Sequence, residues 1–199
     1  MLKIISLNFN KIITSAASIF TYIFGASIIG VIGGSISGAI VGFIAGIIKG
    51  ISDFTNIGNL EFFISISMIA STITIGAPLG ALVGFITGLH IKFFRLHNVH
   101  SFLWGVITFI SVNLGFWFSF QNGLTSLDVF TYLNIATASL VSGWLSHKYT
   151  HNKARKENWK SQELSLTIAG TMSGSVIISL MTFFYFTLME YIRNIFPAI

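Results

Sequence analysis

Five long stretches of this 199-residue chain contain no Asp, Glu, Lys or Arg, and they limit what the chain can fold into. They comprise residues 12–48, 62–91, 96–127, 129–147 and 164–189. A helix needs about 20 predominantly apolar residues to cross the hydrocarbon core of a bilayer. We therefore predict an all-α integral membrane protein of about five transmembrane helices, forming a single transmembrane helical domain over residues 1–199. The expected spans are about 18–48, 62–91, 101–120, 129–147 and 164–189.

The composition agrees with a membrane location. Hydrophobic residues make up 53% of the chain and charged residues only 9%, with a mean hydropathy of +0.82. Soluble domains carry about 25% charged residues, so a cytosolic enzyme, a disordered chain and a nucleic-acid-binding domain are excluded. The chain has no cysteine, which excludes disulfides and thiolate metal sites. We expect a multi-pass protein of a bacterial-type cytoplasmic membrane, with an organelle membrane as the alternative.

The first uncharged stretch is longer than one crossing requires. Its 37 residues would form a helix of about 55 Å, whereas the hydrocarbon core is about 30 Å thick. Tilt, an extension outside the membrane before about Ser18, or a break at Gly33 and Gly34 would each absorb the excess. The stretch is also too long for the apolar region of a cleaved signal peptide.

The charges predict the orientation, because basic residues concentrate on the cytoplasmic side of membrane proteins. With five crossings, the N-terminus, residues 92–100 and a basic loop of residues 148–162 share one side, whose net charge is +7. The other side carries −2. We therefore expect the N-terminus in the cytoplasm. Residues 50–61, 121–128 and the C-terminus are expected outside.

The most specific pattern is a pair of glycine ladders with a spacing of four residues, a repeated GxxxG or glycine zipper. The predicted helix-packing residues are Gly30, Gly34, Gly38, Gly42, Gly46 and Gly50 in the first span, and Gly76, Gly80, Gly84 and Gly88 in the second. Lipid gives little hydrophobic drive for helix association, so close backbone approach through small residues supplies the packing. We expect both ladders to form helix interfaces.

The two ladders share a sequence repeat. Residues 38–46 match residues 80–88 at seven of nine positions, at an offset of 42 residues. With the predicted topology, the two copies run in opposite directions, as in the inverted repeats of transporters. The stronger interpretation is convergence of two glycine-rich helices under the same packing demand.

Polar residues inside the spans are uncharged. Asn113 and Asn134 are candidates for a polar path near the middle of the membrane. The competing interpretation is that such Asn, Ser and Thr side chains bond neighbouring helices as packing groups. Ion-coupled carriers usually keep a charged group within the membrane, and no span contains one.

The segment after the fourth span is rich in cations. Its candidate residues for binding anionic lipid head groups or a partner protein are Lys148, Lys153, Arg155, Lys156 and Lys160. An ordinary orientation signal explains the same residues. His97 with His100, and His147 with His151, have spacings compatible with metal binding, but few carboxylates could complete such a site, so we predict no metal and no cofactor.

No catalytic motif occurs in the sequence, so the protein is not expected to be an enzyme. The expected function is that of a non-catalytic subunit that assembles with itself or with other membrane proteins through its glycine faces. The alternative is a membrane transport component, such as a small-solute channel or the substrate-binding subunit of a transporter. Expected partners are the lipid bilayer and other membrane subunits, with no nucleic acid.

Overall fold

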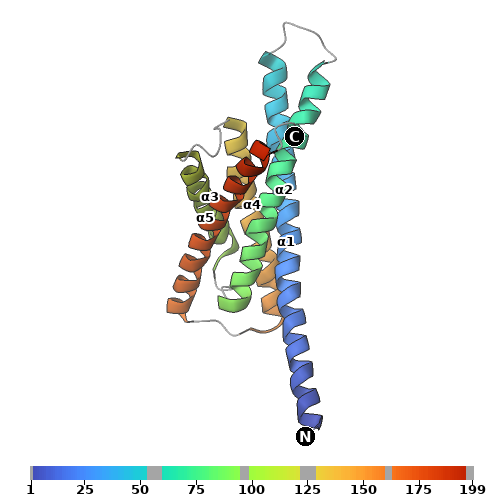
Figure 1. Ribbon diagram of the computed structural model, residues 1–199, viewed down its shortest axis with the longest axis vertical. Helices are drawn as coiled ribbons and strands as arrows, with labels where there is room; N and C mark the ends of the chain where they lie inside the picture. Colours follow the sequence, from blue (N-terminus) through green and yellow to red (C-terminus); the bar gives the residue numbers. More distant parts are fainter. Residues whose placement is uncertain (1, 53–59, 95–98, 122–128, 160–162, 196–199) are drawn as a thin grey trace.

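The computed structural model describes residues 2–52, 60–94, 99–121, 129–159 and 163–195, and the regular structure in these segments is α-helical. Five helices follow one another: α1 (Leu2–Ser52), α2 (Leu60–Phe94), α3 (Ser101–Gln121), α4 (Val129–Lys156) and α5 (Leu164–Ile195). Consecutive helices run in opposite directions (Figure 1). The predicted all-α architecture is confirmed.

Four of these helices are long and apolar enough to cross a membrane. The candidate spans are Thr14–Lys49, Ile66–Phe94, Ser101–Gln121 and Leu164–Ile192. Within the described residues, α4 is not among them, because Ser, Thr and Asn interrupt its apolar residues and three cations occupy its last turn. The four apolar helices indicate an integral membrane protein. A fifth crossing by α4 stays a prediction.

Helix α1 is uninterrupted over 51 residues, which corresponds to about 76 Å. It does not break at Gly33 and Gly34, so that way of shortening the first span is wrong. Instead, α1 extends past the other helices at its N-terminal end, and the paired ends of α1 and α2 extend past them at the opposite end (Figure 1). The excess length is therefore absorbed by projection beyond the bundle.

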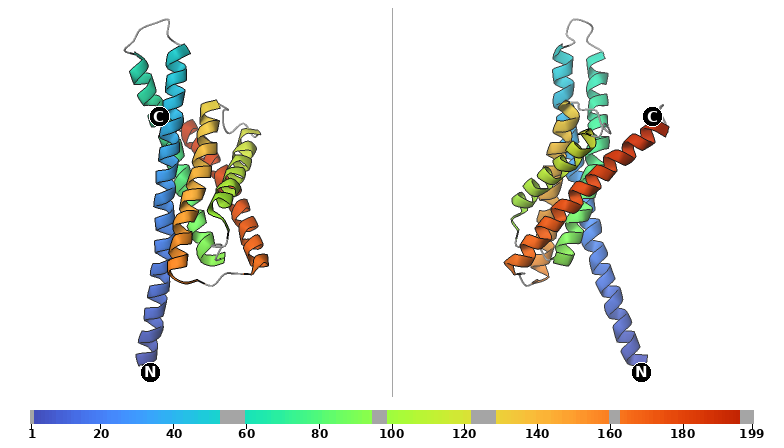
Figure 2. Two further views of the ribbon diagram at one scale, coloured as in Figure 1. Left: turned by 180° about the vertical axis from the view of Figure 1, so that it is seen from behind. Right: turned by 60° about the vertical axis from the view of Figure 1, so that its left-hand side comes forward.

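The five helices form two overlapping groups. Helices α1, α2 and α4 contact one another, while α3 packs against α4 and α5, and α5 also contacts α2. Figure 2 shows α5 crossing the bundle obliquely on the side away from α1. Helices α2 and α4 therefore connect the two groups.

Helix α4 continues beyond its predicted end at residue 147 and shortens the predicted loop of residues 148–162. The segment after His147 contains no Gly or Pro to stop the helix, and the cations of its last turn favour the negative end of the helix dipole. The helix ends at Lys156, and Asn158, two residues later, has a φ of 52°. The Asn158 and Trp159 amides donate to the carbonyl oxygens of Arg155 and Ala154, the pattern of a Schellman cap.

The apolar core lies among α2, α3, α4 and α5, while large apolar side chains also cover the outside. Trp104 and Phe116 are almost fully buried at its centre. Ile40 of α1, Phe102 of α3 and Leu180 of α5 are more than half exposed. Such an exterior matches a lipid environment rather than water.

Candidate functional site

Three helices, α1, α2 and α4, meet along a seam that contains much of both predicted glycine ladders. Each helix contributes one residue in every four. We call the following residues the three-helix seam: Ser18, Tyr22, Ala26, Gly30, Gly34 and Gly38 of α1; Lys92, Gly88, Gly84, Gly80, Gly76 and Thr72 of α2; and Ala154, Thr150, Ser146, Ser142, Ala138 and Asn134 of α4.

At the centre of the seam, the backbones of α1 and α2 touch. A Cβ atom added to Gly34 would collide with the carbonyl oxygen of Gly76, and one added to Gly76 would collide with the carbonyl oxygen of Gly34. Gly30 and Gly80 have the same reciprocal relation. These Cα–H groups therefore point at carbonyl oxygens, the geometry of weak Cα–H···O contacts. Only glycine fits at these positions.

The same register continues in both directions. Gly84 faces the carbonyl of Ala26, Gly88 faces that of Tyr22, and Gly38 faces that of Thr72. Each step of four residues along α1 thus corresponds to a step of four residues back along α2. Because a spacing of four exceeds the 3.6 residues of a helical turn, the two helices must cross to keep this contact, and Figure 1 shows them crossing.

The remaining ladder residues lie toward the projecting ends of the two helices. Gly42 lies against Thr72, Ile69 and Met68 of α2. Gly46 is buried in α1. The surroundings of Gly50 fall outside the described part of the chain.

Helix α4 supplies hydroxyl groups to the backbone of α1. Ser142 Oγ donates to the carbonyl oxygen of Gly30 at 3.0 Å, and Ser146 Oγ donates to that of Ala26 at 2.9 Å. All six α4 residues of the seam have an exposed fraction of 0%. Glycine and alanine leave the carbonyls of α1 accessible, so that hydroxyls from a third helix can reach them.

Asn134 lies at one end of the seam. Its Nδ2 donates to the carbonyl oxygen of Thr72 at 2.7 Å, and Thr72 Oγ1 donates to the carbonyl oxygen of Gly38 at 2.6 Å. Asn134 Oδ1 is buried without a hydrogen-bond partner among the described residues, and it lies beside Gly76. The two hydrogen bonds together connect α4 to α2 and α2 to α1.

Asn113, the other residue of the predicted polar path, has a different environment. Its Nδ2 donates to the carbonyl of Phe109 in its own helix at 2.7 Å. It lines a groove of about 400 Å³ together with aromatic residues that include Trp117 and Tyr132. The structure therefore places Asn113 on a groove and Asn134 in the seam, and does not join them in one path.

At the opposite end of the seam, Lys92 takes the ladder position that follows Gly88. Its Nζ donates to Ser18 Oγ at 2.7 Å and lies 5.0 Å from the ring centroid of Tyr22. Lys153 Nζ lies 4.5 Å from the same centroid. Two ammonium groups, one from α2 and one from α4, therefore converge on a single buried tyrosine.

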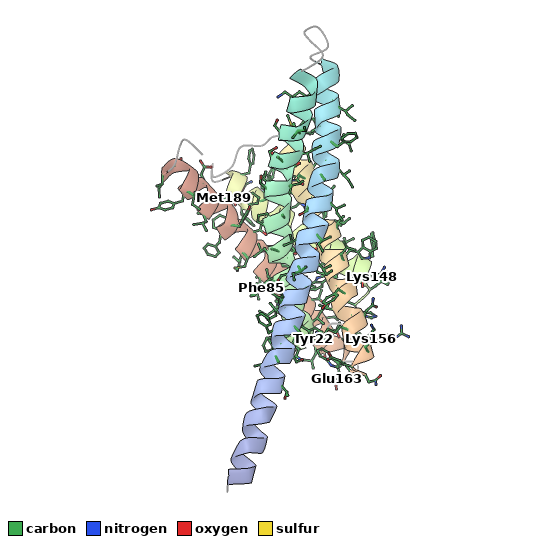
Figure 3. The ribbon with its side chains drawn as sticks, turned by 90° about the vertical axis from the view of Figure 1, so that its right-hand side faces the viewer. Tyr22, Phe85, Lys148, Lys156, Glu163 and Met189 are labelled. Atoms are coloured by element: carbon green, nitrogen blue, oxygen red, sulfur yellow. The ribbon has the colours of Figure 1, made fainter. Side chains whose placement is uncertain are left out.

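Trp159 completes this cluster. Its ring stacks on Tyr22 with centroids 5.0 Å apart and lies 4.7 Å from Lys92 Nζ. Trp159 Nε1 also donates to a carboxylate oxygen of Glu157 at 3.0 Å. The Schellman cap of α4 is what returns Trp159 toward α1. In Figure 3, Tyr22 lies on the side of α1 where the end of α4 carries Lys156.

The predicted lipid-binding or partner-binding cations are divided by the fold. Lys148 is exposed and lies 5.6 Å from the ring centroid of Trp144. Arg155 and Lys156 are exposed, whereas Lys153 is half-buried. Lys160 lies outside the described residues. Among the described members of this set, Lys153 alone enters the cluster around Tyr22.

Histidines near this end belong to packing contacts. His147 Nδ1 lies 3.0 Å from Ser101 Oγ, and His90 Nδ1 lies 2.9 Å from the carbonyl of Ile86. In the described segments, no three His, Asp or Glu side chains come close enough to hold a metal ion. His97 lies outside these segments.

Sequence reasoning missed the role of α4. Its seam residues recur every four positions from Asn134 to Ala154, but only two of them are hydrophobic and none is glycine. A search for small residues of any polarity at that spacing would have found them. Lys92 and Tyr22 were also missed, because neither is small, although both continue the ladder spacing.

The chain matches no protein-family model, and no curated protein or solved structure matches it. Its function is therefore inferred from its own residues.

Proposed function

We propose that this protein is a non-catalytic multi-pass membrane protein that acts as a structural subunit of a membrane complex or of a homo-oligomer. The observation that carries this proposal is the use of the buried polar groups. Among the described residues, buried polar side chains are all Ser, Thr, Asn or His. Those of the seam mostly bond helix carbonyls, which suits a rigid scaffold rather than a moving carrier.

In this proposal, the glycine faces have a different role from the one expected from the sequence. Gly30, Gly34, Gly76 and Gly80 face one another within one chain, so they stabilise the protomer instead of recruiting a partner. Partner contacts then use the projecting pair of α1 and α2. Toward that end of α1, Phe43, Ile44 and Ile47 are about half exposed.

One observation favours the alternative, a membrane transport component. The groove lined by Asn113 combines aromatic walls with one amide, which would suit an uncharged solute. A substrate-binding subunit built this way would need no buried charge.

The decisive experiment is native mass spectrometry of the full chain released from nanodiscs, combined with flux in liposomes that contain only this protein. A reproducible oligomer or copurified membrane subunit, with no gradient-dependent uptake, is the expected result. Uptake of a solute that is abolished by Asn113→Leu would replace the assembly proposal with the transport one.

The proposed orientation has its own test. The chain contains no cysteine, so single cysteines at positions 49 and 155 can be labelled with an impermeant thiol reagent in intact cells. Labelling is expected at 49 only. Labelling at both positions from the same face would contradict the five-crossing topology.

A further inference from the structure

One side of α3 faces away from the bundle and carries an amide among apolar side chains. Ile110, Leu114 and Trp117 lie on this side at spacings of four and three residues, and each is about half exposed. Asn113 lies beside them and is half-buried. We call these four residues the α3 face. A side that met only lipid would need no polar residue, so the amide is the feature to explain.

Asn113 lies near the middle of the apolar span Ser101–Gln121. It is 12 residues from Ser101 and 8 residues from Gln121, or about 18 Å and about 12 Å at 1.5 Å per residue. The hydrocarbon core of a bilayer is about 30 Å thick, so no water is available at this depth to satisfy the amide. Its hydrogen bonds therefore depend on protein groups or on a bound molecule.

The described chain satisfies only part of this amide. Asn113 Nδ2 donates to the carbonyl oxygen of Phe109, four residues earlier in α3, at 2.7 Å, and this bond uses one of its two hydrogens. Asn113 Oδ1 is buried without a hydrogen-bond partner among the described residues. Buried polar atoms almost always have a partner. The missing partner of this amide is therefore to be sought outside the described part of the chain.

Asn134 shows what such an amide does where a neighbouring helix is present. Its Nδ2 donates across to the carbonyl oxygen of Thr72 in α2 at 2.7 Å, and its Oδ1 lies beside Gly76 of the same helix. Bonding to a neighbouring helix is the usual role of Asn in a membrane. Beside Asn113, the described helices leave a groove instead. The comparison predicts that a helix of another molecule occupies this place.

A second copy of the chain fits this place better than an unrelated helix. Two copies with the same orientation are related by a two-fold axis along the membrane normal, so each Asn113 meets the other at the same depth. A primary amide is both donor and acceptor, so two of them can bond each other in both directions. The last side-chain torsion of Asn is soft, and rotation about it turns Oδ1 toward the partner. An unrelated helix would need a matching polar residue at that depth.

The shape of the α3 face is also self-complementary. Its apolar residues form a ridge, and they border a groove of about 400 Å³ whose lining includes Tyr132 of α4. In a two-fold pair, the ridge of each copy packs against the groove of the other. In the left view of Figure 2, α3 lies on the far side of α4 from α1. The α3 face is therefore separate from the projecting pair of α1 and α2.

We propose that the α3 face is the contact between two copies of this protein, with a pair of Asn113 amides near its centre. This inference rests on the proposed function, because it names a second copy as one partner of the subunit. The projecting pair of α1 and α2 is left for a different partner. The ridge of the second copy, and not a solute, then fills the groove beside Asn113.

Disulfide cross-linking tests the α3 face, because the chain contains no cysteine of its own. Ile110→Cys, Leu114→Cys and Trp117→Cys, each oxidised with copper phenanthroline in native membranes, should give cross-linked dimers, since a disulfide needs Cβ atoms about 4 Å apart. Ile36→Cys on α1 and Leu180→Cys on α5 are similarly exposed controls and should stay monomeric. No cross-link from the α3 variants, or equal yields from all five, would overturn the proposal.

The role of the amide pair is tested by resonance energy transfer between copies labelled at a cysteine at position 155, in liposomes of increasing lipid-to-protein ratio. Asn113→Leu should weaken association about tenfold, since it removes the hydrogen bonds between the two amides. Asn113→Gln keeps an amide and should retain most of the association. Circular dichroism checks that both variants keep the helix content of wild type. Association of Asn113→Leu as tight as that of wild type would refute the amide pair.

The native mass spectrum of the full chain separates this inference from the proposed function. An oligomer or a copurified subunit without cross-linking through α3 would reject the α3 face and leave the proposed function standing. Monomers with neither would reject both. A small molecule that wild type retains and Asn113→Leu loses, without any cross-link through α3, would assign the groove to a solute and overturn the contact between copies.

Discussion

The contact between α1 and α2 and the contact between α3 and α5 solve the same packing problem in different ways. In the first, glycine backbones touch directly. In the second, one glycine, Gly115, faces the carbonyl oxygen of Ser179, and side chains carry much of the remaining contact. Ser111 Oγ and Ser175 Oγ lie 2.7 Å apart, and Ser179 Oγ donates to the carbonyl of Ser111 at 2.8 Å. Phe116 and Phe186 pack edge to face with centroids 5.1 Å apart.

This difference predicts different tolerance to change. A backbone contact has no rotamer that can move aside, so an added side chain must separate the helices. A contact between side chains can repack at modest cost. The α1–α2 pair should therefore be the intolerant half of the molecule and the α3–α5 pair the tolerant half.

The largest effect is expected from Gly34→Leu. The new side chain would enter the space of the Gly76 carbonyl, and the loss of stability should be about 3 kcal/mol or more, beyond any gain in helix propensity. Detergent-resistant folded protein, measured by size-exclusion chromatography and circular dichroism, should decrease sharply. Ile36→Leu on the exposed side of the same helix is the control. Wild-type stability of Gly34→Leu would mean that α1 and α2 are not in backbone contact.

An intermediate effect is expected from Asn134→Ala. This change removes the bond from α4 to the carbonyl of Thr72 and should cost about 1–2 kcal/mol in an unfolding titration with sodium dodecyl sulfate. Asn113→Ala is a matched control, since the Asn113 amide bonds only its own helix in the described structure and should cost less. If the two variants lose the same stability, the seam has no special dependence on α4.

The smallest effect is expected from Ser175→Ala in the α3–α5 contact. Its hydroxyl pairs with Ser111 Oγ, and hydrogen bonds between membrane helices contribute about 0.6 kcal/mol on average. The Ser111→Ala, Ser175→Ala double variant should lose little more than either single variant, because both remove the same bond. A loss as large as that of Gly34→Leu would reverse the comparison between the two halves.

Much of the fold could be predicted because apolar length is a strong signal in a membrane protein. The five helices follow the five uncharged stretches closely. The end of α4 was not predictable from apolarity, since charged residues can continue a helix beyond its apolar stretch. The helix ends at Lys156, just before Asn158 adopts a left-handed conformation.

The candidate site was less predictable, because its residues have in common their spacing along the helices and not their chemical type. Gly34, Ser142 and Lys92 belong to three residue classes that sequence patterns treat separately. Tertiary packing determines which helix packs against a glycine ladder. The spacing of the glycines alone does not identify that helix. The link between Tyr22 and Trp159 also depends on how the cap of α4 turns the chain.

The repeated spacing in the seam has a consequence for how the two long helices find their alignment. If α2 slid along α1 by one step of four residues, Gly34 would meet Gly80 and Gly38 would meet Gly76, so glycine would again face glycine. The glycines therefore permit several alignments that are almost equal in fit. The alignment is selected at the ends, where Gly88 leaves room for the backbone carbonyl of Tyr22, and the side chain of Lys92 would occupy that room after such a slide. The many small residues of the seam therefore allow several alignments of α1 and α2. The few larger residues at its ends determine which alignment forms.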